Sequence, residues 1–145
     1  MNNALFVLHL CSTLFMTGLI WIVQRLHYPS YSYIDKLKFA DYQQFHTTQI
    51  TFIVGPIMVI EVFSGLFLLI QSEWDQLHII NFSGLCIIWL ATLFLSVPSH
   101  NKLSLGFDEN TVKFLVNTNW IRTITWTLRS ILLCSLLLKV LNHES

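Results

Sequence analysis

The chain has 145 residues, of which 54% are hydrophobic and only 11% are charged, with eight basic and eight acidic side chains. Soluble domains carry about 25% charged residues, so this composition argues against a soluble protein. A soluble helical bundle is the alternative class, but it would have little polar surface to cover its core. The balanced charge also excludes the basic surface that nucleic acid requires.

The apolar residues form four blocks, at residues 4–23, 50–70, 79–97 and 120–140. Each block has about 20 residues, enough to cross a hydrocarbon core of about 30 Å at 1.5 Å per residue. The sequence therefore predicts an all-α protein with a single domain, an integral membrane four-helix bundle whose direct partner is the lipid bilayer.

The first block lacks the basic run and the cleavage site of a signal peptide, so we expect a mature membrane span. Polar residues recur along it at helical spacing, namely His9, Thr13, Thr17 and Gln24. Tyr28-Pro29 is expected to end the helix, because a residue before proline disfavours the α region. Residues 33–48 then predict a short amphipathic helix in the first loop, which lies at the membrane interface and runs into the second span.

The second block contains Glu61 near its middle, and the fourth contains Arg129 at a matching depth. A charge in the middle of a span costs at least about 2.5–3.5 kcal/mol, so it normally faces a partner or a watery cavity. We therefore expect Glu61 and Arg129 to form an ion pair. Such a pair suits two roles, holding the helices together or contributing to a ligand site, and both stay open.

The charges of the loops predict the orientation of the bundle. The second loop, residues 71–78, has acidic residues and no lysine or arginine, whereas the first and third loops contain Arg25, Lys36, Lys38, Lys102 and Lys113. The positive-inside rule places these basic loops in the cytoplasm. We expect a multi-pass protein of the inner (cytoplasmic) membrane with both termini on the non-cytoplasmic side.

The last span is expected to belong to one continuous helix that begins after a turn at Gly106 and a capping residue, Asp108. Its inward face presents Asn119, Arg122, Trp126 and Arg129. An anion-friendly, aromatic-lined face of this kind suits a carboxylate, a phosphate head group or a quinone-like oxygen. The candidate ligand-binding residues are therefore Asn119, Trp126, Arg129, Glu61 and Gln24.

Three histidines are expected at the cytoplasmic mouth of the bundle, His27, His46 and His100. Three imidazoles on separate segments can form a metal site with an open position for water or oxygen. Ordinary interface histidines that bond to loops are the alternative. Haem requires histidines that face each other from different helices, for which His9 and His78 are candidates. A metal ion and haem are thus the two candidate cofactors.

Two stretches resemble a known family. Residues 97–103, VPSHNKL, and residues 119–123, NWIRT, are similar to the second half of the small four-helix membrane proteins of the anthrone-oxygenase-like family. The resemblance implies cofactor-poor oxidation of an aromatic substrate in some members, with Asn101 and Arg122 as site residues. His100, beside Asn101, completes the set of candidate catalytic residues.

The first span also resembles another four-helix membrane protein. Residues 9–11, HLC, residues 17–19, TGL, and Arg25-Leu26 are similar to the first helix of HemJ-type protoporphyrinogen oxidases. This second resemblance implies a haem-linked reaction.

Together these features predict a membrane-embedded oxidoreductase or oxygenase-like protein that acts on a small hydrophobic or aromatic compound near the cytoplasmic side. The alternative is a non-enzymatic ligand-binding, transport or accessory subunit that uses the arginine face. The sequence leaves open whether the chain acts alone, as a homo-oligomer or within a membrane complex.

Overall fold

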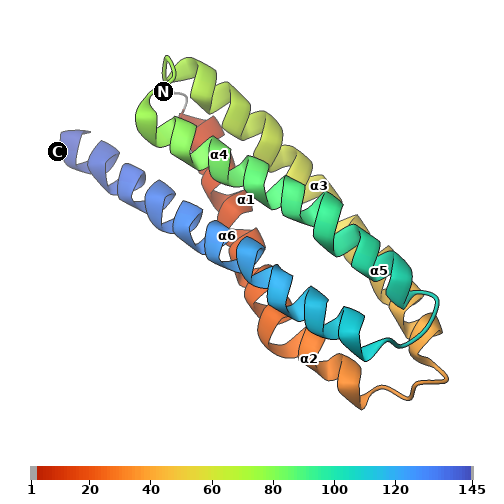
Figure 1. Ribbon diagram of the computed structural model, residues 1–145. Helices are drawn as coiled ribbons and strands as arrows, with labels where there is room; N and C mark the ends of the chain where they lie inside the picture. The colour runs from red at the N-terminus through yellow and green to blue at the C-terminus, as the bar shows by residue number, and fades with distance from the viewer. Residues whose placement is uncertain (1–2, 145) are drawn as a thin grey trace.

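The computed structural model describes the backbone of residues 3–144 and the side chains of residues 3–142. The chain forms four long helical rods, which run side by side in Figure 1. The first rod consists of α1 (Asn3–Ile22), η1 (Val23–His27), α2 (Tyr28–Ser30) and η2 (Tyr31–Tyr33). The second rod is α3 (Phe39–Gln71), and the third consists of α4 (Gln76–Ala91), η3 (Thr92–Ser96) and α5 (Val97–Leu103). The fourth rod is α6 (Glu109–Glu144). The predicted all-α four-helix architecture is confirmed.

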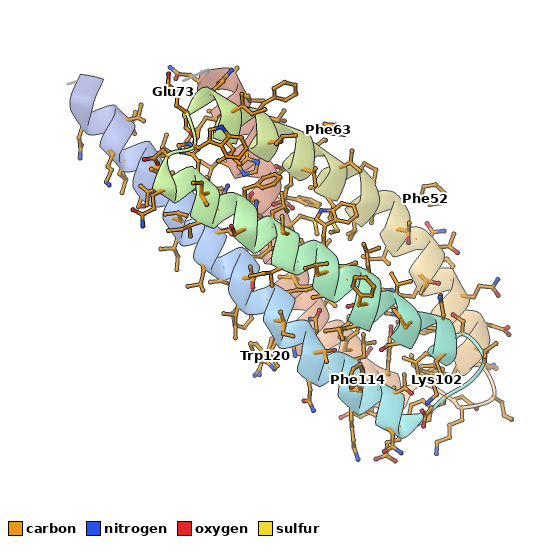
Figure 2. The ribbon with its side chains drawn as sticks, turned by 45° about the horizontal axis from the view of Figure 1, so that its top comes forward. Phe52, Phe63, Glu73, Lys102, Phe114 and Trp120 are labelled. Carbon is orange, nitrogen blue, oxygen red and sulfur yellow. The ribbon has the colours of Figure 1, made fainter. Side chains whose placement is uncertain are left out.

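The rods form a ring, because α1 packs on α3 and α6, and α4 packs on the same two helices. Both termini and the α3–α4 turn lie at one end of the bundle, which we call the terminal end (Figure 1). The loops at residues 34–38 and 104–108 lie at the other end, which we call the loop end. In Figure 2, Glu73 marks the terminal end and Lys102 marks the loop end.

The distribution of side chains is that of a membrane protein. All four rods are long and apolar enough to cross a membrane. Large apolar side chains point outward, such as Phe52, which is 75% exposed and directed away from the other helices in Figure 2. Three charged side chains, Glu61, Arg122 and Arg129, are buried in the interior. An apolar exterior around a partly polar interior suits a hydrocarbon environment.

The first rod does not end at Tyr28-Pro29, contrary to the prediction. Residues 23–27 form a π-helical turn, in which the backbone N–H of Tyr28 bonds to the carbonyl of Val23. Proline lacks an N–H, and its ring collides with the carbonyl four residues earlier in a regular helix. The wider π turn accommodates the proline, so the helix continues to Tyr33.

The predicted helix over residues 33–48 runs into the second span as expected, but it begins later, at Phe39. The first rod ends at Tyr33, and α3 begins at Phe39 and continues without a break into the second span. Phe39 is fully buried, with its ring centroid 5.4 Å from that of Tyr31 and 5.1 Å from that of Phe107. This edge-to-face packing anchors the start of α3 in the bundle.

The fourth rod follows the prediction. The chain turns at Gly106, whose φ of 148° suits glycine, and α6 then runs unbroken from Glu109. Asp108 precedes α6 and accepts hydrogen bonds from Lys102, at 2.6 Å, and from Thr111. These two donors hold the pKa of the Asp108 carboxyl at about 2, well below its usual value, so the ion pair with Lys102 persists into acidic solution.

Candidate functional site

An apolar cavity of about 250 Å³ lies within the half of the bundle nearer the loop end. All four rods contribute to its lining. Its walls are formed by aliphatic and aromatic side chains, including Met16, Ile20, Val54, Met58, Trp89 and Trp126. Its polar end is formed by Tyr28, His46, His100 and Arg122. Apolar walls with a few converging polar groups are the usual construction of a small-molecule site.

Arg122 provides the charge of this cavity. Its side chain is only 7% exposed. The guanidinium Nε donates to Oδ1 of Asn119 at 3.0 Å, and Nη2 donates to the same oxygen and to the hydroxyl of Tyr28 at 3.2 Å. Nη1 makes only a long contact, 3.5 Å, with the hydroxyl of Thr92. All of these partners are neutral.

The predicted residues Asn119 and Gln24 lie behind Arg122 and fix its position. Asn119 donates through Nδ2 to Oε1 of Gln24 at 2.7 Å, and Gln24 donates to the backbone carbonyl of Val116 at 3.2 Å. Gln24 lies in the π turn η1, which directs its side chain toward α6. Both side chains are buried, so they orient the guanidinium rather than line the cavity.

His100 is also held at the polar end. Its Nε2 lies 3.1 Å from the hydroxyl of Tyr28, and its Nδ1 lies 2.7 Å from the amide nitrogen of Gln43. Arg122, Tyr28, His100 and Gln43 therefore form one chain of polar contacts. Tyr28 and Gln43 were not among the predicted site residues. The polar spacing of the first span allows either His27 or Tyr28 at its inner end, and the amphipathic segment places Gln43 near the mouth of the bundle, but neither pattern indicates a contact with His100.

The three loop-end histidines converge as expected. His27 and His46 stack with their ring centroids 3.8 Å apart, and the centroids of His46 and His100 are 6.0 Å apart. Stacking turns ring faces, rather than nitrogen lone pairs, toward each other. No group of three histidine, cysteine or acidic side chains in the described part of the chain is arranged to hold a metal ion. The rings of His27 and His46 are thus stacked rather than arranged with His100 around a common ion, and the metal site stays a prediction.

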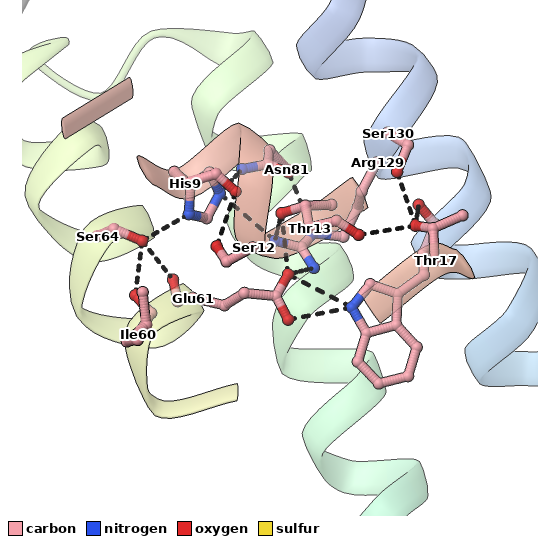
Figure 3. A network of polar contacts seen from close by, with 11 residues as sticks. His9, Ser12, Thr13, Thr17, Ile60, Glu61, Ser64, Asn81, Arg129 and Ser130 are labelled. Atoms are coloured by element: carbon pink, nitrogen blue, oxygen red, sulfur yellow. Dashed lines mark hydrogen bonds and ion pairs between the residues drawn. The ribbon is translucent and has the colours of Figure 1, made fainter. Parts of the chain in front are cut away.

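A second polar network lies nearer the middle of the bundle (Figure 3). Arg129 Nη1 lies 2.7 Å from Oε1 of Glu61, and the two side chains are 3% and 0% exposed. Glu61 also accepts from the hydroxyl of Thr13 at 2.9 Å and from the indole nitrogen of Trp126 at 3.1 Å. The predicted Glu61–Arg129 pair is confirmed. Its members neutralise each other and do not line the cavity, unlike the ring of Trp126.

His9 belongs to the same network and does not fit a haem ligand. Its Nδ1 lies 2.8 Å from the hydroxyl of Ser64, and its Nε2 lies 2.9 Å from the amide nitrogen of Asn81. Both ring nitrogens are therefore engaged, which leaves neither for an iron. The other candidate, His78, lies beside Asp75 at the terminal end, at 3.3 Å.

One predicted catalytic residue lies away from the site. Asn101 is exposed on α5 and does not line the cavity. The prediction placed it in a loop after Pro98, but the helix continues to Leu103. His100 therefore faces the bundle, and the next residue points outward.

Comparisons of the chain with family models, with curated proteins and with solved structures found no match. The two family resemblances therefore stay predictions, and the function has to be argued from the site itself.

Proposed function

We propose that this multi-pass membrane protein binds a small hydrophobic or aromatic compound in the cavity, with Arg122 contacting an oxygen of that compound. The proposal places the protein in the inner membrane, with the loop end and its lysines in the cytoplasm. The compound would then reside in the cytoplasmic half of the membrane.

The cavity itself is the observation that supports this function. An apolar cavity of about 150 Å³ is known to hold benzene, so a volume of about 250 Å³ has room for a larger aromatic body. Trp89 and Trp126 line it and offer flat surfaces for stacking. In addition, the indole N–H of Trp89 is buried without an acceptor among the described residues. Buried donors are normally satisfied, so an acceptor supplied by a ligand would complete this site.

Gly55 provides a direct test of the proposal. It lines the cavity, and a Cβ atom at this position would meet no atom within 4 Å. A leucine at this position should therefore occupy the cavity without moving the backbone. We expect Gly55→Leu to weaken the binding of 6-bromo-2-naphthol at least about tenfold, because the space for the ring is filled. Binding is measured as quenching of tryptophan fluorescence by bromine, in neutral detergent.

The matched control is Gly18→Leu. Gly18 also has open space where a Cβ would lie, but it is exposed on α1 and does not line the cavity. This variant should bind the naphthol as the wild type does. Equal binding by the wild type and Gly55→Leu would show that the probe binds elsewhere, and the proposal would fail.

Oxidation of the bound compound is a second candidate function. The contact between Tyr28 and His100 favours it, because a hydroxyl on the cavity wall is coupled to an imidazole, as proton transfer requires. The resemblance to the anthrone-oxygenase-like family supports the same reaction. Anthrone is therefore the probe, and its oxidation by one dioxygen yields anthraquinone and water.

We expect His100→Gln to lower the rate of anthraquinone formation at least about a hundredfold, which is the low end of a general acid–base contribution. His78→Gln, at the terminal end, is the control and should retain the wild-type rate. Oxidation at the rate of empty detergent micelles would exclude this activity and leave the binding function.

A further inference from the structure

The two buried arginines of α6 differ in how their charges are balanced. Arg129 lies against the carboxylate of Glu61, at 2.7 Å (Figure 3). Arg122 lies on the same face of α6 two turns away. It is also buried and contacts only the neutral groups of Asn119, Tyr28 and Thr92. An arginine cannot discard its charge, since the guanidinium stays protonated in proteins. A buried charge is normally paired with an opposite charge, whereas Arg122 has no counter-ion among the described residues.

The chain does not supply this counter-ion within the region described. Glu61 is the one buried acidic side chain among those described, and it already pairs with Arg129. The remaining described acidic residues lie in the loops and at helix ends, at residues 35, 41, 73, 75, 108 and 109. No carboxylate of the described residues lies within ion-pair distance of Arg122. The missing negative charge must therefore come from outside these residues.

The free hydrogen-bonding capacity of Arg122 is on Nη1. A guanidinium has five N–H groups, two of them on Nη1. Nε and Nη2 bond to Asn119 and Tyr28, whereas Nη1 has only the contact of 3.5 Å with Thr92. Arg122 itself lines the apolar cavity. An anion that binds Nη1 must therefore fit among apolar walls, which favours an organic anion over a hydrated inorganic one.

We infer that the occupant of the cavity is a lipophilic monoanion, an apolar body with one negatively charged oxygen group that pairs with Arg122. This inference rests on the proposed binding function and specifies the class of its ligand. The single positive charge of the Arg122 guanidinium is neutralised by a single negative charge on the ligand. The apolar body would extend from Arg122 toward Met58 and Trp126, deeper in the bundle.

The test compares two ligands of equal shape, 6-bromo-2-naphthoate and the neutral 6-bromo-2-naphthalenemethanol, by quenching of tryptophan fluorescence in neutral detergent. The wild type should bind the acid at least about tenfold more tightly than the alcohol, because charge-assisted bonds are the stronger class. Arg122→Gln should remove this preference. Arg122→Lys, which keeps the charge without the planar fork, should retain part of it.

The outcomes separate the two proposals. Equal binding of the acid and the alcohol by the wild type would overturn the monoanion and keep the binding function. Binding of neither compound would overturn both. A preference that disappears when sodium chloride replaces an uncharged osmolyte would identify an inorganic anion as the occupant and overturn the inference. Should Arg122→Gln fail to fold, the wild type still decides, because at equal concentration the acid should raise its melting temperature more than the alcohol does.

Discussion

At the scale of single residues, the pairing of Glu61 with Arg129 was predictable and its surroundings were not. Two opposite charges at matching depth in apolar spans are sufficient to predict a contact. The further partners of the pair, Thr13 and Trp126, depend on how each helix is rotated about its axis. A single sequence does not fix that rotation when every span has polar residues on it.

The ion pair should be structural, which a double substitution tests. Glu61→Gln leaves Arg129 buried without its carboxylate, and Arg129→Gln leaves Glu61 without its cation. Each single change is expected to destabilise the protein by about 3–5 kcal/mol, because it leaves an unpaired buried charge. The double variant should recover much of this loss, since two amides can bond to each other. Unfolding in detergent followed by circular dichroism measures all three variants.

The result that would contradict a structural role is equally clear. If the double variant folds as stably as the wild type but loses binding of the naphthalene probes, the pair contributes to ligand binding instead. If it is as unstable as the sum of the single changes, the two residues do not act as a pair.

At the scale of elements, the same device occurs twice. The π turn η1 precedes Pro29, and the π turn η3 precedes Pro98, where the N–H of Val97 bonds to the carbonyl of Thr92. Tyr28 and His100, which contact each other, follow these two turns. Short π-helical segments are frequent at functional sites. The sequence shows both prolines, but the rule that a helix ends before proline predicts the wrong boundary at each of them.

Close packing between α1 and α3 depends on a glycine. A Cβ atom at Gly65 would lie 2.9 Å from Cε1 of His9, whose ring is held by Ser64 and Asn81. Gly65→Ala should therefore displace His9 and destabilise the bundle by about 1–3 kcal/mol, as overpacking does. The control, Gly18→Ala, adds a methyl group in open space and should be neutral or slightly stabilising. Thermal unfolding in one detergent compares the two, and equal melting temperatures would contradict the close approach.

At the scale of the whole molecule, the four spans were predictable because the thickness of the hydrocarbon core sets the length of each apolar segment. The cavity was not predictable, because it is the volume that remains after the helices have packed. Gly55 leaves space at its wall, and no pattern of apolar residues indicates where such space remains. Arg122 was expected at the site and lies there, whereas Asn101 followed the helix to its outer face.

The orientation of the bundle is the remaining prediction at this scale, and it rests on charge. The loop end carries Lys36, Lys38, Lys102 and Lys113, whereas the turn at the terminal end carries Glu73 and Asp75. In a chain whose three native cysteines are replaced by alanine, Trp74→Cys and Lys102→Cys place one thiol at each end. A membrane-impermeant maleimide should label position 74 in intact spheroplasts and position 102 only after lysis, since basic loops stay in the cytoplasm. Labelling in the reverse order would show that the bundle has the opposite orientation. The cavity with Arg122 would then lie in the outer half of the membrane.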